Sequence, residues 1–446
     1  MLPARQGSGH KGEPMEVQLA FDRDGASVLL PDGLDTQILR PRFAAGLPDE
    51  NRALEEAITN PIGCPSLREL ARGKRSAAIA VCDITRPAPN KVVLPHVIRA
   101  LEAGGVPAHA IAILIATGLH REATADELDE ILGAEILARH PVRSHRAREI
   151  DEQTFLGETS GGTQAFVDER FVEADLHITL GFIEPHLMAG FSGGRKLISI
   201  GLAGERTIKR LHSPLYMRDA DATEGSFPDN PLHRELLEIA AMAGHDFMVD
   251  VALTDTRSIA AVFAGEPVAT HAQGVAFVRQ STLARVEEPA DAVITTSGGY
   301  PLDLTFYQAV KGLTAAAHVV RDGGEILLAA ACKEGLGGPE FSALVRSAGD
   351  SSALLDALTN RAVQVDQWQA EKLAMVADRA QLSFCVPGLS EDDRSKLWGP
   401  AHADPQEAVD GIVGRLGSGA RLVVIPEGPY VFSQLAPSAD AGLGAR

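Results

Sequence analysis

The run EPHLMAGFSGGRK at residues 184–196 decides how the rest of this 446-residue chain can be arranged. The residues before it, DLHITLG (175–181), alternate and include β-branched side chains, so they predict a strand that hands over to a glycine-rich loop or helix. Glycine lets the backbone approach a ligand closely there. The run continues through GLAGERTI (201–208) to His212, which brings two histidines and a lysine near one bend.

A βαβ rhythm precedes this run. Buried strands are predicted at 76–82 and 110–115, with a helix at 91–103 between them and a further strand at 176–180. In parallel sheets the carboxyl ends of the strands carry the ligand-binding loops. Three such ends would present these residue pairs: Asp83 and Arg86, His120 and Arg121, and His186 and Lys196.

The rhythm restarts from about residue 276, with strands expected at 291–296, 324–330, 381–385 and 421–426. We therefore expect an α/β protein of two α/β domains with mostly parallel sheets. The first would span 15–275, starting with a hairpin over 15–31, and the second 276–435. A ligand site would lie in the cleft between them.

Composition excludes several classes of protein. Lys+Arg 41 against Asp+Glu 60 gives a net charge of −19, which opposes binding to nucleic acid or anionic membranes. The 4 cysteines lie far apart, which suits reduced thiols in the cytoplasm better than a disulfide framework. The amino-terminal residues have no apolar signal region and no run reaches the length of a membrane span, so we expect a cytoplasmic protein folded from near Met15.

Three familiar site motifs fail. In the run 190–196 an arginine stands where a P-loop needs its second glycine, and Leu197 follows the lysine instead of a hydroxyl residue. No G-x-G-x-x-G follows the first strand of either domain, and no H-E-x-x-H occurs. Glycine pairs can mark plain turns and a lone histidine is more often structural, so the residues alone leave the chemistry open.

Several spaced motifs, in order along most of the chain, resemble those of the nickel-dependent lactate racemase family. They are DITRP (83–87), GLHR (118–121), PHxxAGFSGGRK (185–196), His212 and YQxxK (307–311). The resemblance implies a nickel-pincer nucleotide, the pyridinium-3-thioamide-5-thiocarboxylic acid mononucleotide of nickel, joined covalently to Lys196. Other proteins of cofactor biosynthesis would supply it.

The resemblance also implies roles around that cofactor. His212 would be the protein ligand of the nickel, for which a neutral imidazole is suitable. His120 and His186 would be the two acid/base histidines. Asp83 and Thr85 would support the cofactor site. Backbone N–H groups of the loop would bind the cofactor phosphate, namely those of Ser192, Gly193, Gly194 and Arg195.

The substrate-binding residues implied by the resemblance are Arg86, Gln308 and Lys311, with Tyr307 in support. An arginine fork matches a carboxylate in a bidentate way, although Arg86 could equally pair with Asp83. The side chain of the substrate stays open, because four residues near the motifs occupy variable positions. They are Leu119, Leu187, Met188 and Tyr300.

The expected activity is that of a racemase or epimerase acting on a 2-hydroxy acid, lactate or a larger analogue, by reversible proton-coupled hydride transfer. Two alternatives remain at this point. One is a zinc hydrolase using His186 and His212 with a carboxylate, and the other is a carrier of nickel or of the cofactor without turnover. Metal analysis would distinguish a zinc hydrolase from the racemase. Turnover of a chiral 2-hydroxy acid would distinguish the racemase from a carrier.

Overall fold

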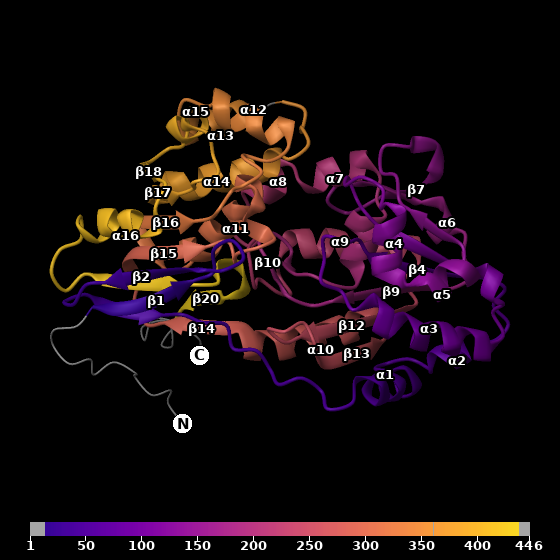
Figure 1. The fold of residues 1–446 in the computed structure, drawn as a ribbon. Coiled ribbons are helices and arrows are strands. Elements are labelled where there is room, and N and C mark those ends of the chain that lie inside the picture. The colour runs from indigo at the N-terminus through magenta and orange to yellow at the C-terminus, as the bar shows by residue number, and fades with distance from the viewer. Residues whose placement is uncertain (1–13, 360, 437–446) are drawn as a thin grey trace, which may run out of the picture. The chain divides into compact units, whose positions relative to one another are not determined.

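The computed structural model describes residues 14–359 and 361–436, which fall into two compact units (Figure 1). The N-terminal unit spans Phe43–Ser281, and the C-terminal unit joins the residues up to Arg42 to those from Thr282 onward. Each unit has a central six-stranded sheet that is wholly or mostly parallel and is accompanied by helices. The expected α/β class with mostly parallel sheets is therefore confirmed.

The sheet of the N-terminal unit has the order β13-β12-β9-β4-β5-β6. Its strands are β4 (Ala77–Cys82), β5 (Ile111–Ala116), β6 (Val142–Ser144), β9 (His177–Phe182), β12 (Phe247–Leu253) and β13 (Ile259–Gly265). All neighbours are parallel except β12 and β13. Every residue of β4 is buried, as expected of an apolar strand in a parallel sheet covered on both faces.

The helices of this unit connect the strands. They are α1 (Glu50–Thr59), α2 (Leu67–Leu70), α3 (Asn90–Gly104), α4 (Ala125–Leu132), α5 (Ala134–Arg139), α6 (Glu169–Val172), α7 (Glu205–Leu211), α8 (Pro214–Met217), α9 (Pro231–Ala243) and α10 (Pro267–Thr282). Helix α3, the β4–β5 crossover, buries Val93, Val97 and Leu101, spaced one turn apart, and ends at left-handed Gly105. Short pieces complete the unit: η1 (Ala108–Ala110), η2 (Ile150–Glu152), η3 (Leu197–Gly201), the hairpin of β7 (Gln153–Glu158) and β8 (Gln164–Asp168), and the pair β10 (Pro185–His186) and β11 (Gly190–Phe191).

The sheet of the C-terminal unit has the order β18-β17-β16-β15-β19-β3, and its neighbouring strands are parallel. Its strands are β3 (Asp35–Ile38), β15 (Ala290–Thr296), β16 (Val320–Ala329), β17 (Gln381–Cys385), β18 (Ala401–His402) and β19 (Arg421–Ile425). The remaining elements are β1 (Met15–Leu19), β2 (Ala26–Leu30), β14 (Leu283–Val286), β20 (Phe432–Leu435), α11 (Phe306–Ala317), α12 (Pro339–Ser347), α13 (Ser351–Thr359), α14 (Gln367–Arg379), α15 (Glu391–Ser395), α16 (Pro405–Val413), η4 (Leu302–Leu304) and η5 (Gly428–Tyr430).

The division into units differs from the expected domains 15–275 and 276–435. Strands β1 and β2 form the expected hairpin, but it belongs to the C-terminal unit, and β3 pairs in parallel with β19. The apolar side of the hairpin, including Val17 and Leu30, packs in one cluster with Ile294 and Val424 of the central strands. Burial of this apolar face explains the assignment, because the side chains that cover it come from strands of the C-terminal sheet.

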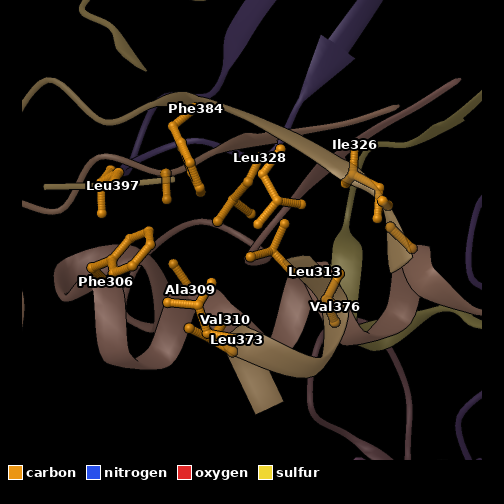
Figure 2. Packing of buried hydrophobic residues seen from close by; sticks show 14 of the residues in the cluster. Phe306, Ala309, Val310, Leu313, Ile326, Leu328, Leu373, Val376, Phe384 and Leu397 are labelled. Carbon is orange, nitrogen blue, oxygen red and sulfur yellow. The ribbon is translucent and has the colours of Figure 1, made fainter. Parts of the chain in front are cut away.

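The core of the C-terminal unit fixes helix α11 (Figure 2). Phe306, Val310 and Leu313 of α11 pack in one buried cluster with side chains of β16, β17 and α14, including Leu328, Phe384 and Leu373. Thr305 caps the helix by accepting a hydrogen bond from the Gln308 N–H at 3.4 Å. The helix that carries Tyr307, Gln308 and Lys311 is therefore held rigidly from its buried side. Among the described residues, no helix combines the length and apolar character needed to span a membrane.

Candidate active site

The predicted residues of the N-terminal unit follow neighbouring strands at a topological switch point. From β4 the chain moves to β5 and β6 in one direction along the sheet, whereas β9, β12 and β13 lie on the other side. Ligands in open α/β sheets bind at the carboxyl ends of the strands where this reversal occurs. Here those ends lead into Asp83 after β4 and Glu184 after β9, with the His120 turn after adjacent β5.

Asp83 and His120 form the first hydrogen-bonded pair of the candidate site. His120 Nδ1 donates to Asp83 Oδ2 at 2.7 Å, and Thr85 Oγ1 donates to Asp83 Oδ1 at 2.7 Å. Burial acts to raise the pKa of Asp83, but the hydrogen bonds from His120 and Thr85 outweigh it and hold this pKa below its usual range. The carboxylate thus keeps a proton on His120 Nδ1, so the neutral ring carries its lone pair on Nε2 and is suited to act as a base.

His186 has the opposite proton placement. It lies in β10, which pairs with β11, and its Nδ1 accepts from the N–H groups of Met188 at 3.3 Å and Ala189 at 3.2 Å. The proton of the neutral ring is consequently on Nε2. The tight bend depends on Gly190, where φ is 75° and a Cβ would lie 1.9 Å from the Ser226 carbonyl oxygen.

Asp250 of β12 forms a hydrogen bond with the glycine-rich loop of residues 190–196. Gly194 N–H donates to Asp250 Oδ2 at 2.8 Å, and a Cβ on Gly193 would lie 2.1 Å from the same oxygen. Ser192 N–H donates to the Glu184 carbonyl at 2.9 Å. The N–H groups of Ser192 and Gly194 already donate to acceptors inside the protein, and binding of the cofactor phosphate by these two groups stays a prediction.

Arg195 is a structural residue of this loop, with a side chain only 1% exposed. Its Nε donates to His233 Nδ1 at 2.9 Å and its Nη1 to His271 Nε2 at 2.6 Å. The guanidinium also donates to loop carbonyls, including that of Phe191 at 2.8 Å. Burial lowers the pKa of Arg195 to about 9, with the charge of Asp250 opposing the shift. Because its donors bond to groups of the protein, the side chain stabilises the loop, and the cofactor-binding role expected of Arg195 stays a prediction for its backbone N–H.

Lys196 and His212 flank a π-helical turn, η3, and helix α7. Burial lowers the pKa of His212 to about 4, the Ile208 carbonyl opposes this, and the charge of Lys196 adds to the lowering. Burial likewise raises the pKa of the Cys82 thiol to about 12, with Lys196 among the charges opposing the rise. Lys196 thus lies within electrostatic reach of both the end of β4 and His212. π-Helical turns of this kind are frequent at functional sites.

His212 has the geometry of a metal ligand. Its Nδ1 donates to the Ile208 carbonyl at 2.8 Å, which fixes the tautomer and leaves the lone pair on Nε2. Its lowered pKa keeps the ring neutral at physiological pH. A neutral imidazole with its other nitrogen anchored to a backbone carbonyl is the common form of histidine in metal sites.

Arg86 faces a carboxylate already in the protein. Its Nη1 lies 3.9 Å from Glu184 Oε1, and both side chains are about a third exposed, at 31% and 32%. Such a long, partly exposed ion pair is weak, so a substrate carboxylate could compete for the guanidinium. Burial, reinforced by the charge of Glu184, raises the pKa of nearby Glu224 to about 8.

Tyr307, Gln308 and Lys311 lie on α11 of the C-terminal unit. The Tyr307 hydroxyl accepts from Trp368 Nε1 at 3.1 Å. Gln308 Oε1 is buried without a hydrogen-bond partner among the described residues. Positions 307 and 311 are one helical turn apart and share a face. The arrangement within α11 is therefore compatible with joint recognition of one polar group.

The chain matches two family models, the lactate racemase N-terminal domain over residues 21–225 and the lactate racemase C-terminal domain over residues 286–432. It is 32% identical to the lactate racemase of Thermoanaerobacterium thermosaccharolyticum over 93% of this chain and 98% of the relative. The chain belongs to the lactate racemase family. It is accordingly a racemase, an isomerase, and not the zinc hydrolase considered from the sequence.

Further comparisons support membership of the lactate racemase family. The lactate racemase of Lactiplantibacillus plantarum is 34% identical over 85% of this chain and 90% of the relative. The structure of the lactate racemase apoprotein from T. thermosaccharolyticum has a TM-score of 0.86 at 30% identity, covering 94% of this chain and 100% of that one.

Several residues that contact or lie near the glycine-rich loop were not predicted from the sequence. Asp250 stands alone in the apolar run FMVDVAL of β12, and an isolated carboxylate in a buried strand is a signal that could have been used. Burial raises the pKa of Asp250 to about 7. His233, His271 and Glu224 lie in segments without any motif, so only the fold brings them to the loop.

His233 makes the stability of this loop sensitive to acid. Burial, then the charges of Arg195 and Arg234, lowers the pKa of His233 to about 3, whereas an unfolded histidine titrates near about 6.5. The unfolded chain binds this proton first as the pH falls. Stability that is present above about pH 6.5 is therefore lost towards pH 3, by about 1.4 kcal/mol per pH unit for this group.

A His233→Asn variant tests this dependence, because the asparagine Oδ1 can still accept from Arg195 Nε but does not titrate. The free energy of unfolding of the parent relative to the variant should decrease by about 2 kcal/mol between pH 7 and pH 5. Urea unfolding at the two pH values measures it. Other titrating groups, Asp250 included, are common to both proteins and cancel. A difference that does not change with pH would contradict the assignment.

Proposed function

We propose that this racemase interconverts the enantiomers of a 2-hydroxy acid, lactate or a larger analogue, using a nickel-pincer nucleotide carried on Lys196. The observation that supports it most is the placement of Lys196 within electrostatic reach of a neutral, anchored His212. Family membership supports the same chemistry. When bound, the cofactor would supply the acceptor for the hydride of the substrate carbon.

The residues present suit such a cofactor. Lys196 would hold it covalently, and His212 Nε2 would ligate its nickel. A metal held largely by its cofactor needs only a single protein ligand. Within residues 14–359 and 361–436, no group of three or more histidine, cysteine, aspartate and glutamate side chains forms a metal site of its own. The N–H groups of Gly193 and Arg195 remain as donors proposed for the cofactor phosphate.

The two histidines would move the hydroxyl proton. His120 Nε2, which carries the lone pair of the neutral ring because Nδ1 donates to Asp83, would accept the proton from the hydroxyl of one enantiomer. His186 would serve the other enantiomer, whose hydroxyl points differently when the carboxylate is held in the same place. Since His186 begins with its proton on Nε2, it would have to shift that proton before it accepts another.

Arg86 would bind the substrate carboxylate as a planar fork. Lys311 and Gln308, with Tyr307, are proposed to complete this recognition from α11. Glu184 would be displaced from Arg86 as the substrate carboxylate binds, because the two carboxylates seek the same guanidinium. Proteins of cofactor biosynthesis are the proposed partners, since this chain would receive the finished nucleotide.

A panel of enantiopure 2-hydroxy acids of increasing side-chain size tests the proposed function. The full-length protein, produced together with the cofactor pathway, should convert each accepted enantiomer to a mixture of both, as followed by chiral chromatography. Nickel and cofactor bound without turnover of any member would instead indicate a carrier. Retention of configuration throughout the panel with a loaded protein would refute racemisation.

His212→Ala should lose nickel while keeping the cofactor mass on Lys196, because the substitution removes the ligand but leaves the lysine. Metal analysis and denatured intact-mass measurement of the same preparation provide the two readouts. His109→Ala, at an exposed histidine of η1, is the control and should retain nickel. Nickel content in His212→Ala equal to that of the control would exclude the ligand role.

A further inference from the structure

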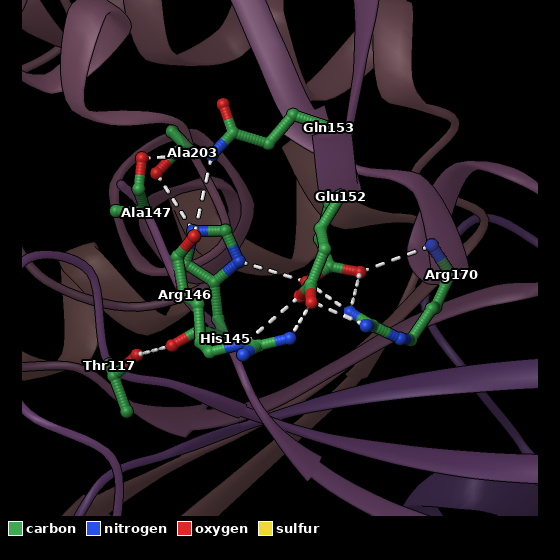
Figure 3. Close-up of polar contacts among 9 residues, drawn as sticks. Thr117, His145, Arg146, Ala147, Glu152, Gln153, Arg170 and Ala203 are labelled. Atoms are coloured by element: carbon green, nitrogen blue, oxygen red, sulfur yellow. Dashed lines mark hydrogen bonds and ion pairs between the residues drawn. The ribbon is translucent and has the colours of Figure 1, made fainter. Parts of the chain in front are cut away.

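Both ring nitrogens and the carbonyl oxygen of His145 form hydrogen bonds inside the N-terminal unit, as Figure 3 shows. The side chain is only 1% exposed and follows β6. Its Nδ1 donates to Asp168 Oδ2 at 2.9 Å and its Nε2 donates to the Ala203 carbonyl at 2.9 Å. The ring is therefore bonded on two opposite sides, to Asp168 and to the Ala203 carbonyl.

The backbone of His145 holds the turn that carries His120. The His145 carbonyl accepts from Thr117 Oγ1 at 2.6 Å, and its N–H donates to the Ile115 carbonyl at 3.0 Å. The next residues of the turn are tied in the same way, since His120 N–H donates to the Thr117 carbonyl at 3.0 Å. The position of His120 relative to β5 thus depends on the strand end at His145.

The ring of His145 holds the segment that joins Lys196 to His212. Ala203 lies between η3 and α7, and the carbonyl that accepts from His145 Nε2 belongs to a fully buried residue. Glu205 N–H, at the start of α7, donates to the Ala147 carbonyl at 2.8 Å. Gly118 N–H donates to the Gly201 carbonyl at 2.9 Å, which links the two segments directly.

A series of ion pairs leads to Asp168, which bonds to the other ring nitrogen. Arg170 contacts Asp168 at 3.3 Å and Glu152 at 2.9 Å, and Glu152 pairs in turn with Arg146 (Figure 3). Asp168 is fully buried and also caps α6. Only His145 and Asp168 are fully buried, so removing one of this pair leaves the other without a partner away from solvent, which is costly. The ring of His145 is therefore held in one orientation.

We infer that His145 is a positioning residue, which keeps the turn bearing His120 and the segment between Lys196 and His212 in one fixed arrangement. The catalytic consequence rests on the proposed function, whereas the structural link does not. His145 itself contacts none of the residues proposed to bind the substrate or the cofactor. Its loss should impair the placement of groups that act together in one reaction and leave Arg86 in place.

His145→Asn tests the inference, since the shorter amide can still reach Asp168 but cannot reach the Ala203 carbonyl. In the full-length, cofactor-loaded protein kcat should fall about 10–100-fold, the usual cost of losing such an orienting contact, with KM little changed. Amide hydrogen exchange should rise locally at Gly118 and Glu205. His140→Asn is the matched control, because His140 is similarly buried in the same unit and donates from Nδ1 to the Ala108 carbonyl at 3.0 Å.

Thr117→Val covers the case in which His145→Asn does not fold, since it removes only the hydroxyl bond to the His145 carbonyl. It should lower kcat and raise exchange at Gly118 without affecting Glu205. An unchanged kcat in the folded variants, or a loss equal to that of His140→Asn, would overturn the inference. If the parent racemises no 2-hydroxy acid, the proposed function fails, and amide hydrogen exchange alone then tests the structural role of His145. A local rise at Gly118 supports that role, and no rise refutes it.

Discussion

Lys196→Ala is expected to carry no cofactor mass and to have no racemase turnover. The only amine that the proposed linkage can use is removed, and no other residue of the run 190–196 offers one, because the Arg195 guanidinium is buried against His233, His271 and the loop carbonyls. Denatured intact-mass measurement of protein produced with the cofactor pathway should show an adduct on the parent and none on the variant.

A matched control keeps this result specific. Lys209→Ala removes an amine of α7 that forms a partly exposed pair with Glu205 at 2.8 Å, and its adduct and turnover should equal those of the parent. Thermal unfolding of both variants checks that the fold is retained. An adduct of undiminished yield on Lys196→Ala would refute the covalent role of the lysine.

The second large effect is expected from the two histidines. His120→Ala and His186→Ala each remove a general acid/base, which contributes roughly 10²–10⁴-fold to rate. Complete racemisation passes through both half-reactions, so either substitution should suppress it. Each variant should nevertheless complete the first half-reaction with one enantiomer, and the two variants should prefer opposite enantiomers.

Single-turnover absorbance of the loaded protein, mixed separately with the D and L substrate, measures this preference. Asp83→Asn offers a graded comparison, because it weakens the contact that keeps the His120 proton on Nδ1 while leaving the ring in place. It should shift the preference in the same direction as His120→Ala, but by less. The same preference in both histidine variants would show that the two-base assignment is wrong.

Much of the fold could be predicted from local pattern. The strands around β4, β5, β9, β15 and β19 are apolar runs bounded by polar tips, and their burial in a parallel sheet follows from composition. The hairpin of β1 and β2 was also visible, but its domain was not. Its apolar face finds its partners on β15 and β19, hundreds of residues later in the chain, and no local pattern carries that information.

The candidate site was predicted in part. The motif residues Asp83, His120 and His212 make contacts that suit the roles expected of them. The acceptors that the Arg195 side chain and two loop N–H groups meet in the folded chain could not be predicted, because the sequence shows only a basic residue and its small neighbours. Asp250 carried a usable signal as a lone carboxylate in an apolar strand, whereas no motif marks His145 or Glu224, so only the folded chain shows what they contact.

The parallel pairing of β3 with β19 also sets the order in which parts of the chain can fold during synthesis. Asp35 and Arg421, which pair at this edge, are separated by 386 residues, so loop closure and contact order delay this step. The N-terminal unit has all of its strands once Gly265 has been made, whereas β1–β3 must wait for the last sheet strand. On ribosome-stalled chains ending before residue 421, we expect Phe43–Ser281 to resist protease while residues 14–42 are cleaved. Protection of that early hairpin in such chains would show that it finds a temporary partner before its final one exists.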